Sequence, residues 1–103
     1  MSDYLADVKK YATNVDEAAV AVIVKYCGIA LSKKDSALVS GSDPKELATV
    51  RNGFASKKLG LSPEAADAGI AAVLVKLKGV THKSRVTFYY LLAEATGTLV
   101  KLG

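Results

Sequence analysis

The sequence predicts an all-α fold: a compact bundle of about five helices joined by short turns, with one longer loop near residues 32–42. Helix start signals recur along the chain, each followed by apolar residues three and four positions apart. Glycines stand where these periodic segments end. Half of the 103 residues are apolar and 23% are charged, as in ordinary globular proteins. We therefore expect a single helical domain over residues 1–103.

Two helices are expected before residue 31. Tyr4, Val8 and Tyr11 have the spacing of a short amphipathic helix. Residues 15–30 are apolar nearly all round, which predicts a central helix packed on two sides. Their many β-branched side chains leave a strand as the alternative. The segment 32–42 contains lysines, serines and a glycine without a sustained period, and we expect it to be the longest loop.

The middle of the chain carries two proline-marked helix starts. Residues 43–46 (Asp-Pro-Lys-Glu) supply an N-cap acceptor, a proline at the first helical position and a glutamate three residues after the cap. This pattern predicts a helix near 44–58, closed by Gly60 in the left-handed conformation. Residues 62–64 (Ser-Pro-Glu) repeat the device, and the helix that follows is expected to end at Gly79.

The last expected helix covers residues 83–97. Its Val-Thr-Phe-Tyr-Tyr run also has strand propensity, but the length of the segment and its lack of turn residues favour a helix. Thr87, Glu94 and Thr98 fall along one polar line of this helix.

The charge of the chain is unevenly distributed. The net charge is +4, yet residues 1–67 hold nine basic and nine acidic side chains and sum to zero. Residues 68–103 hold five basic side chains and one acidic one, so the whole surplus lies there. A basic surface attracts phosphates, nucleic acid or an acidic partner. The ordinary interpretation is a solvated surface that maintains solubility.

Two places combine basic residues with features that suit anions. Lys57 and Lys58 open the glycine turn 57–63, which is similar to the turns of DNA-binding helix-hairpin-helix modules but lacks their second glycine. An ordinary helix connection is the favoured interpretation of this turn, and phosphate contact is the alternative. The second place is the start of the last helix.

His82, Lys83 and Arg85 stand at that start, among two hydroxyl side chains and the free N–H groups of a helix N-terminus. These side chains are candidate ligands for an anion. The alternative is a solvated helix end without a ligand.

The chemistry needed for catalysis is sparse. One histidine, His82, and one cysteine, Cys27, cannot supply the four ligands of a zinc site. Neither a phosphate-binding loop nor a dinucleotide fingerprint is present. We therefore expect no metal, no cofactor and no enzymatic activity, with a Cys27–His82 dyad as a remote alternative. No secretory leader is visible, and the longest apolar stretch, 18–31, is too short to span a bilayer, which predicts a cytoplasmic protein without membrane contact.

Several of these residues together resemble a family of bacterial proteins of about 100 residues that is classed as a domain of unknown function. The resemblance covers about residues 43–97. It rests on the Pro44-x-Glu46-Leu47-x-Thr49-Val50 start, Phe54, the Lys57-Lys58-Leu59-Gly60-Leu61 turn, and Lys83-x-Arg85 leading to Tyr89-Tyr90. It implies a compact, mostly helical cytoplasmic protein of bacteria and brings no activity, cofactor or catalytic residue.

Three functional hypotheses follow. The first is a non-enzymatic interaction module that self-associates or binds an acidic partner through Lys57, Lys58, Lys83 and Arg85. The alternative is weak nucleic-acid or phosphate binding through the turn 57–63 and the basic helix start 82–85. An enzyme with an unrecognised small-molecule pocket is the third.

Overall fold

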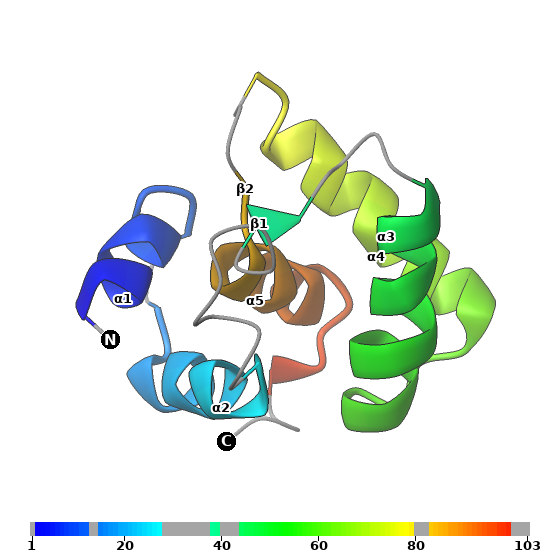
Figure 1. Cartoon of the computed structure of the whole chain (residues 1–103), viewed down its shortest axis with the longest axis horizontal. Coiled ribbons are helices and arrows are strands. Elements are labelled where there is room, and N and C mark those ends of the chain that lie inside the picture. The colour runs from blue at the N-terminus through cyan, green and yellow to red at the C-terminus, as the bar shows by residue number, and fades with distance from the viewer. Residues whose placement is uncertain (1, 13–14, 28–37, 40–43, 80–82, 100–103) are drawn as a thin grey trace.

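Helices dominate the computed structural model, which describes residues 2–12, 15–27, 38–39, 44–79 and 83–99 (Figure 1). The elements in chain order are α1 (Ser2–Lys9), α2 (Glu17–Cys27), β1 (Leu38–Val39), α3 (Pro44–Val50), η2 (Arg51–Lys58), α4 (Pro63–Lys76), β2 (Lys83–Ser84) and α5 (Arg85–Ala95). The Cα radius of gyration is 12.1 Å, near the value of about 13 Å typical of a compact chain of this length. The prediction of a compact all-α fold is confirmed.

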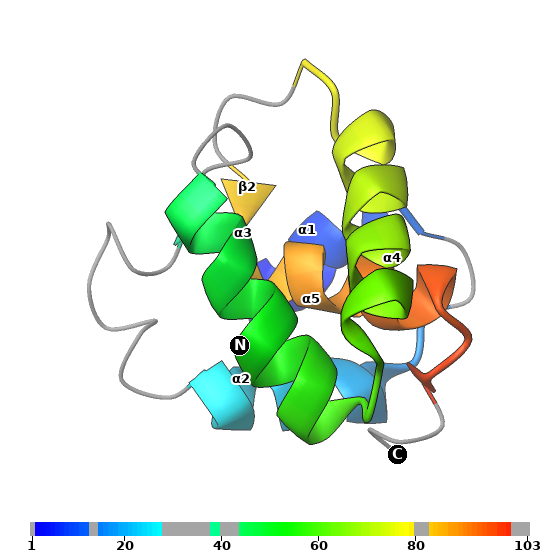
Figure 2. The same cartoon turned by 90° about the vertical axis from the view of Figure 1, so that its right-hand side faces the viewer.

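Helix α5 lies at the centre of the molecule. Every residue from Arg85 to Ala93 is buried, and the helix packs against α1, α2, α4 and η2. Figures 1 and 2 show α1 and α2 on one side of α5, and the α3–η2 helix and α4 on the other. The core therefore forms around the last helix of the chain.

This arrangement corrects our expectation that residues 15–30 form the central helix. Helix α2 buries Ala19, Val20 and Ile23 but exposes Lys25 and Tyr26, so it covers the core from one side. Helix α5 can occupy the centre although it contains polar residues, because their side chains form hydrogen bonds inside the protein.

Two of those partners come from the N-terminal region. Thr87, which we placed on a polar line, is buried and donates its hydroxyl hydrogen to the carboxylate of Asp7. The Tyr90 hydroxyl oxygen accepts a hydrogen bond of 2.9 Å from the backbone N–H of Asp16. These two contacts tie α1 and the start of α2 to α5.

Helices α3 and η2 form one continuous helix over residues 44–58, as predicted. Its second half has π-helical spacing, and the backbone N–H of Leu59 donates to the carbonyl oxygen of Phe54 at 3.1 Å. The N–H of Leu61 then donates to the carbonyl oxygen of Ala55 at 2.9 Å. Gly60, with a φ of 68°, makes this closing turn possible, also as predicted. The predicted cap residue 43 lies outside the described residues.

The second proline-marked start is confirmed at α4. The Ser62 hydroxyl oxygen accepts a hydrogen bond of 3.3 Å from the N–H of Ala65, and Pro63 is the first helical residue. The helix ends at Lys76, and Gly79 has a φ of 88° in the turn that follows. The helix ends near the predicted boundary.

Strands β1 and β2 form a short antiparallel ladder, in which Leu38 pairs with Ser84 and Val39 with Lys83. Strand β1 lies in the segment that we expected to be a loop. Two paired residues are too few to produce a recognisable period, so the sequence pattern could not reveal them. Because β2 runs directly into α5, the ladder fixes where the central helix begins.

Within the ranges that the structure describes, we find no helix with the length and apolar character that a membrane crossing requires.

Candidate functional site

Arg85 begins the central helix and is only 9% exposed. Its Nη2 lies 2.5 Å from Oε1 of Glu46 in the first turn of α3. Its Nη1 donates a hydrogen bond of 3.0 Å to the Tyr89 hydroxyl oxygen, one turn further along α5. The guanidinium carbon also lies 5.7 Å from the centroid of the Tyr89 ring. This buried group therefore joins the starts of α5 and α3.

Two opposing effects act on the charge of Arg85. Burial alone lowers the pKa of its guanidinium, whereas Tyr89 and the Glu46 carboxylate raise it through charge and hydrogen bonding. The raising effects prevail, and the pKa of Arg85 lies above its ordinary value. The side chain consequently stays charged throughout the physiological pH range.

The burial of Arg85 corrects its expected place on a basic surface. The partly exposed carboxylate of Glu46 supplies the counter-charge, so the buried guanidinium does not depend on solvent to stabilise its charge. Because 39 residues separate Glu46 from Arg85, local sequence patterns cannot predict this ion pair. Lys83 lies in β2, but its side chain and all of His82 are outside the described residues.

Three aromatic rings connect the Arg85 region with the surface. The rings of Phe54 and Tyr89 stack with centroids 4.1 Å apart and an interplanar angle of 15°. Tyr26 meets Phe54 edge-on at 5.3 Å and lies 6.5 Å from the Tyr89 ring. Phe54 and Tyr89 are buried, whereas Tyr26 is 44% exposed. The exposed ring thus rests on a buried aromatic pair.

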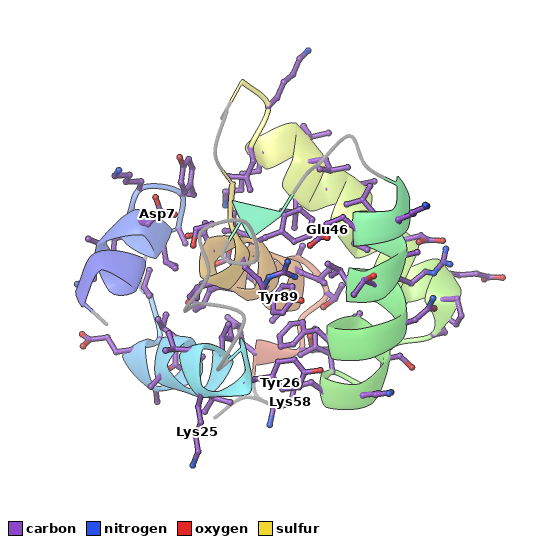
Figure 3. All side chains as sticks on the ribbon, viewed as in Figure 1. Asp7, Lys25, Tyr26, Glu46, Lys58 and Tyr89 are labelled. Atoms are coloured by element: carbon purple, nitrogen blue, oxygen red, sulfur yellow. The ribbon has the colours of Figure 1, made fainter. Side chains whose placement is uncertain are left out.

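Lysines stand near Tyr26 in the last turns of α2 and η2. Lys58 lies one turn after Phe54 on η2, and Figure 3 shows Tyr26 and Lys58 near each other at the ends of α2 and η2. Lys25 precedes Tyr26 and points away from the body of the protein in the same figure. Lys57 is also exposed. We call these four residues, Lys25, Tyr26, Lys57 and Lys58, the Tyr26 surface.

The lysines also have a structural role. Lys25 stands in the last turn of α2, and Lys57 and Lys58 in the last turn of η2. Positive charge is favourable there because the last turn of a helix carries the negative end of its dipole. These three lysines therefore stabilise the ends of their helices and also contribute positive charge to the Tyr26 surface.

The glycine turn after Lys58 uses part of its backbone internally. A phosphate cradle would need free N–H groups, but those of Leu59 and Leu61 donate to carbonyl oxygens of η2. The Ser62 side chain is likewise engaged with Ala65. Two amides of the turn are thus already used in closing the helix.

Sequence reasoning identified Lys57 and Lys58 but not the exposure of Tyr26. Tyr26 lies in a segment that is apolar nearly all round, so helical spacing could not predict which side of the helix faces solvent. The neighbouring Lys25 was the one signal that this side of α2 meets water.

Among the residues that the structure describes, no group of three or more His, Cys, Asp or Glu side chains could hold a metal ion. No curated protein matches the chain. The model of a family of proteins of unknown function (DUF2853) matches residues 3–100, nearly the whole sequence. By this match, the chain belongs to that family.

Proposed function

We propose that this protein is a non-enzymatic interaction module that binds an acidic protein segment through the Tyr26 surface. One observation carries the proposal: a tyrosine that is 44% exposed packs on two buried rings, and lysines stand beside it at the ends of α2 and η2. Exposed aromatic side chains beside positive charge are common anchors of protein interfaces.

The support beneath Tyr26 favours binding. Contacts with Phe54 and Tyr89 restrict the ring before a partner arrives, so less side-chain entropy is lost when a partner covers it. Tyrosine can then contribute both apolar contact area and its hydroxyl group. A rigid ring is consequently a better anchor than an equally exposed flexible side chain.

The lysines favour an acidic partner. Lys25 and Lys57 are exposed and Lys58 is half-buried, so a segment that covers Tyr26 approaches positive charge at the ends of α2 and η2. Such charges accelerate encounter and select against basic partners, and salt weakens their effect. Binding should therefore depend on both the ring and the ionic strength.

An acidic protein segment explains this surface better than nucleic acid does. Phosphates would use the same lysines, but two backbone amides of the adjacent turn are occupied within the protein. The pairing of Arg85 with Glu46 removes a further charge that we had assigned to an anion site. Nucleic-acid binding is retained as an outcome that the experiment distinguishes.

Fluorescence anisotropy with a labelled peptide of alternating glutamate and leucine tests the proposal, with labelled duplex DNA as the second probe. We expect the peptide to bind at low salt and Tyr26→Ala to raise its Kd about tenfold. Lys58→Glu should weaken binding, whereas Lys9→Glu should have little effect. Lys9 is exposed at the end of α1 and provides the same change in net charge.

Three results would contradict the proposal. The peptide could fail to bind at low salt, or Lys58→Glu and Lys9→Glu could weaken it equally, which would mean that net charge alone governs the affinity. Binding of DNA without binding of the peptide would favour the phosphate alternative.

A further inference from the structure

The outer face of α4 carries apolar side chains that the described part of the chain leaves uncovered. Ala68, Ala71, Ala72 and Val75 are all exposed, and Val75 is 76% exposed. Their spacing places them on one side of the helix. In Figure 2, α4 runs along the outside of the molecule in front of α5. This face is separate from the Tyr26 surface.

The same face continues into a shallow groove between α4 and the end of α5. Small and apolar side chains provide most of its lining: Leu61, Ala65, Ala68, Gly69, Ala72, Ala95 and Thr96. Small side chains allow the backbone of a second helix to approach closely. A second helix can therefore lie close against this side of α4.

Charges at the two ends of α4 have opposite signs. Glu64 and Asp67 are exposed in its first turns, Lys76 is exposed at its last residue, and Lys78 is exposed in the turn that follows. Asp67 faces Arg51 and Lys76 faces Glu94, each pair 3.4 Å apart at the surface. Glu64 and Lys78 form no ion pair within the described residues. Two copies of this face are complementary only when their helices run antiparallel.

From this complementarity we infer that a second copy of the chain docks on the outer face of α4, with the two α4 helices antiparallel. The arrangement is isologous, so each contact occurs twice about a two-fold axis. With the axis passing at Ala71, Glu64 of each copy lies opposite the partner's Lys78. The antiparallel helix dipoles also attract one another.

In the same register, Val75 of each copy contacts the α4 helix of the other copy. Glu64, Asp67, Ala68 and Ala71 are spaced as the four residues that form a hole on a helix surface, and Val75 of the other copy fits this hole as a knob. The two exposed valines are thereby removed from water. One helix of 14 residues offers less area than a standard interface, so we expect a dimer with a Kd in about the micromolar to millimolar range.

Sedimentation equilibrium over a range of protein concentrations tests this dimer. The weight-average mass of the natural chain should rise from the 10.8 kDa of the monomer toward twice that value. Val75→Asp, Glu64→Lys and Lys78→Glu should each raise the dissociation constant about tenfold or more, because each places unfavourable charge in the contact. Circular dichroism checks that these variants of exposed residues remain folded.

The combined charge reversal distinguishes an antiparallel dimer from a parallel one. A chain with both Glu64→Lys and Lys78→Glu restores opposite charges at both contacts and should dimerise like the natural chain. A parallel dimer would place each position against itself, so neither single reversal would weaken it. Tyr26→Ala should leave the dimer unchanged, which makes this test independent of acidic-peptide binding.

A natural chain that remains monomeric at the highest concentration that stays in solution would overturn the inference. Dimerisation of Val75→Asp and of the single reversals as strong as that of the natural chain would also overturn it, since the contact would then lie elsewhere. Failure of the double reversal to restore the dimer would contradict the antiparallel register.

Discussion

Arg85 and Glu46 illustrate why a buried charge depends on one particular partner. The guanidinium is almost fully buried, and the carboxylate 2.5 Å away compensates its charge. Removing one member of such a pair leaves the other buried without compensation, whereas replacing both by apolar side chains removes the problem. The pair consequently specifies how α3 meets α5 more than it adds net stability.

Glu46→Ala is expected to lower the free energy of unfolding by about 2 kcal/mol, below the usual range for a buried pair because Glu46 is partly exposed. The combined change Glu46→Leu and Arg85→Met should cost less than Glu46→Ala alone. Urea unfolding followed by circular dichroism measures both. A double variant that is destabilised as much as Glu46→Ala, or more, would contradict this account of the pair.

Helix α4 packs tightly against the C-terminal end of α5 at Gly69. A Cβ atom at this position would lie 2.5 Å from Cγ2 of Thr96 and 2.7 Å from Cδ1 of Leu92. Leu92 is fully buried, and the Thr96 hydroxyl donates to the carbonyl oxygen of Leu92 at 2.9 Å, so neither side chain can move away easily. Only glycine fits at position 69 without a shift of these neighbours, because any side chain would overlap with them.

Gly69→Ala should therefore destabilise the protein by about 1–3 kcal/mol, although alanine is normally the better helix former. Gly53→Ala in η2 is the matched control because a Cβ atom there meets nothing within 4 Å. The control should raise stability by about 0.5–1 kcal/mol. Thermal unfolding compares them, and an equal rise in Tm for both variants would disprove the close approach.

The sequence predicts helix boundaries well where the signal is local. Ser62 caps α4 through a neighbouring amide, and Gly60 ends the preceding helix through its own conformation. The identity of the central helix could not be predicted in this way. Thr87 is a polar residue, and the distant Asp7 accepts a hydrogen bond from its buried hydroxyl group.

The candidate site divides along the same line. Lys57 and Lys58 stand out by charge alone, and both lie in the last turn of η2, where Figure 3 shows Lys58 near the exposed Tyr26. Arg85 is also positively charged, but it is buried and paired with Glu46. The two residues are 39 positions apart, so a local sequence pattern does not reveal the pair. The exposure of Tyr26 likewise follows from the tertiary position of α2. Patterns in one sequence contain no information about such distant partners.

On the scale of the whole molecule, α5 is the element on which the others assemble. Asp7 and Asp16 bind it from the N-terminal region, Glu46 from α3, and Gly69 from the close contact with α4. All of these partners precede α5 in the chain. The last helix therefore completes the core, and contacts between distant parts of the sequence determine its stability.

This organisation predicts unequal protection from hydrogen exchange. Amides of α5 should exchange only when the whole protein unfolds, because the helix is surrounded by other elements. Helix α1 has eight residues and is joined to α5 by the contact between Asp7 and Thr87. It should open locally at a lower free energy.

Thr87→Val tests this difference because it removes the hydroxyl group while preserving the shape of the buried side chain. Exchange in α1 should accelerate by about tenfold, corresponding to one lost hydrogen bond to a charged group, relative to exchange in α4. Mass-spectrometric exchange of peptides from α1, α4 and α5 measures the effect. Equal acceleration in all three would mean that α1 opens only with the rest of the molecule, since a change confined to global stability affects every globally exchanging amide alike.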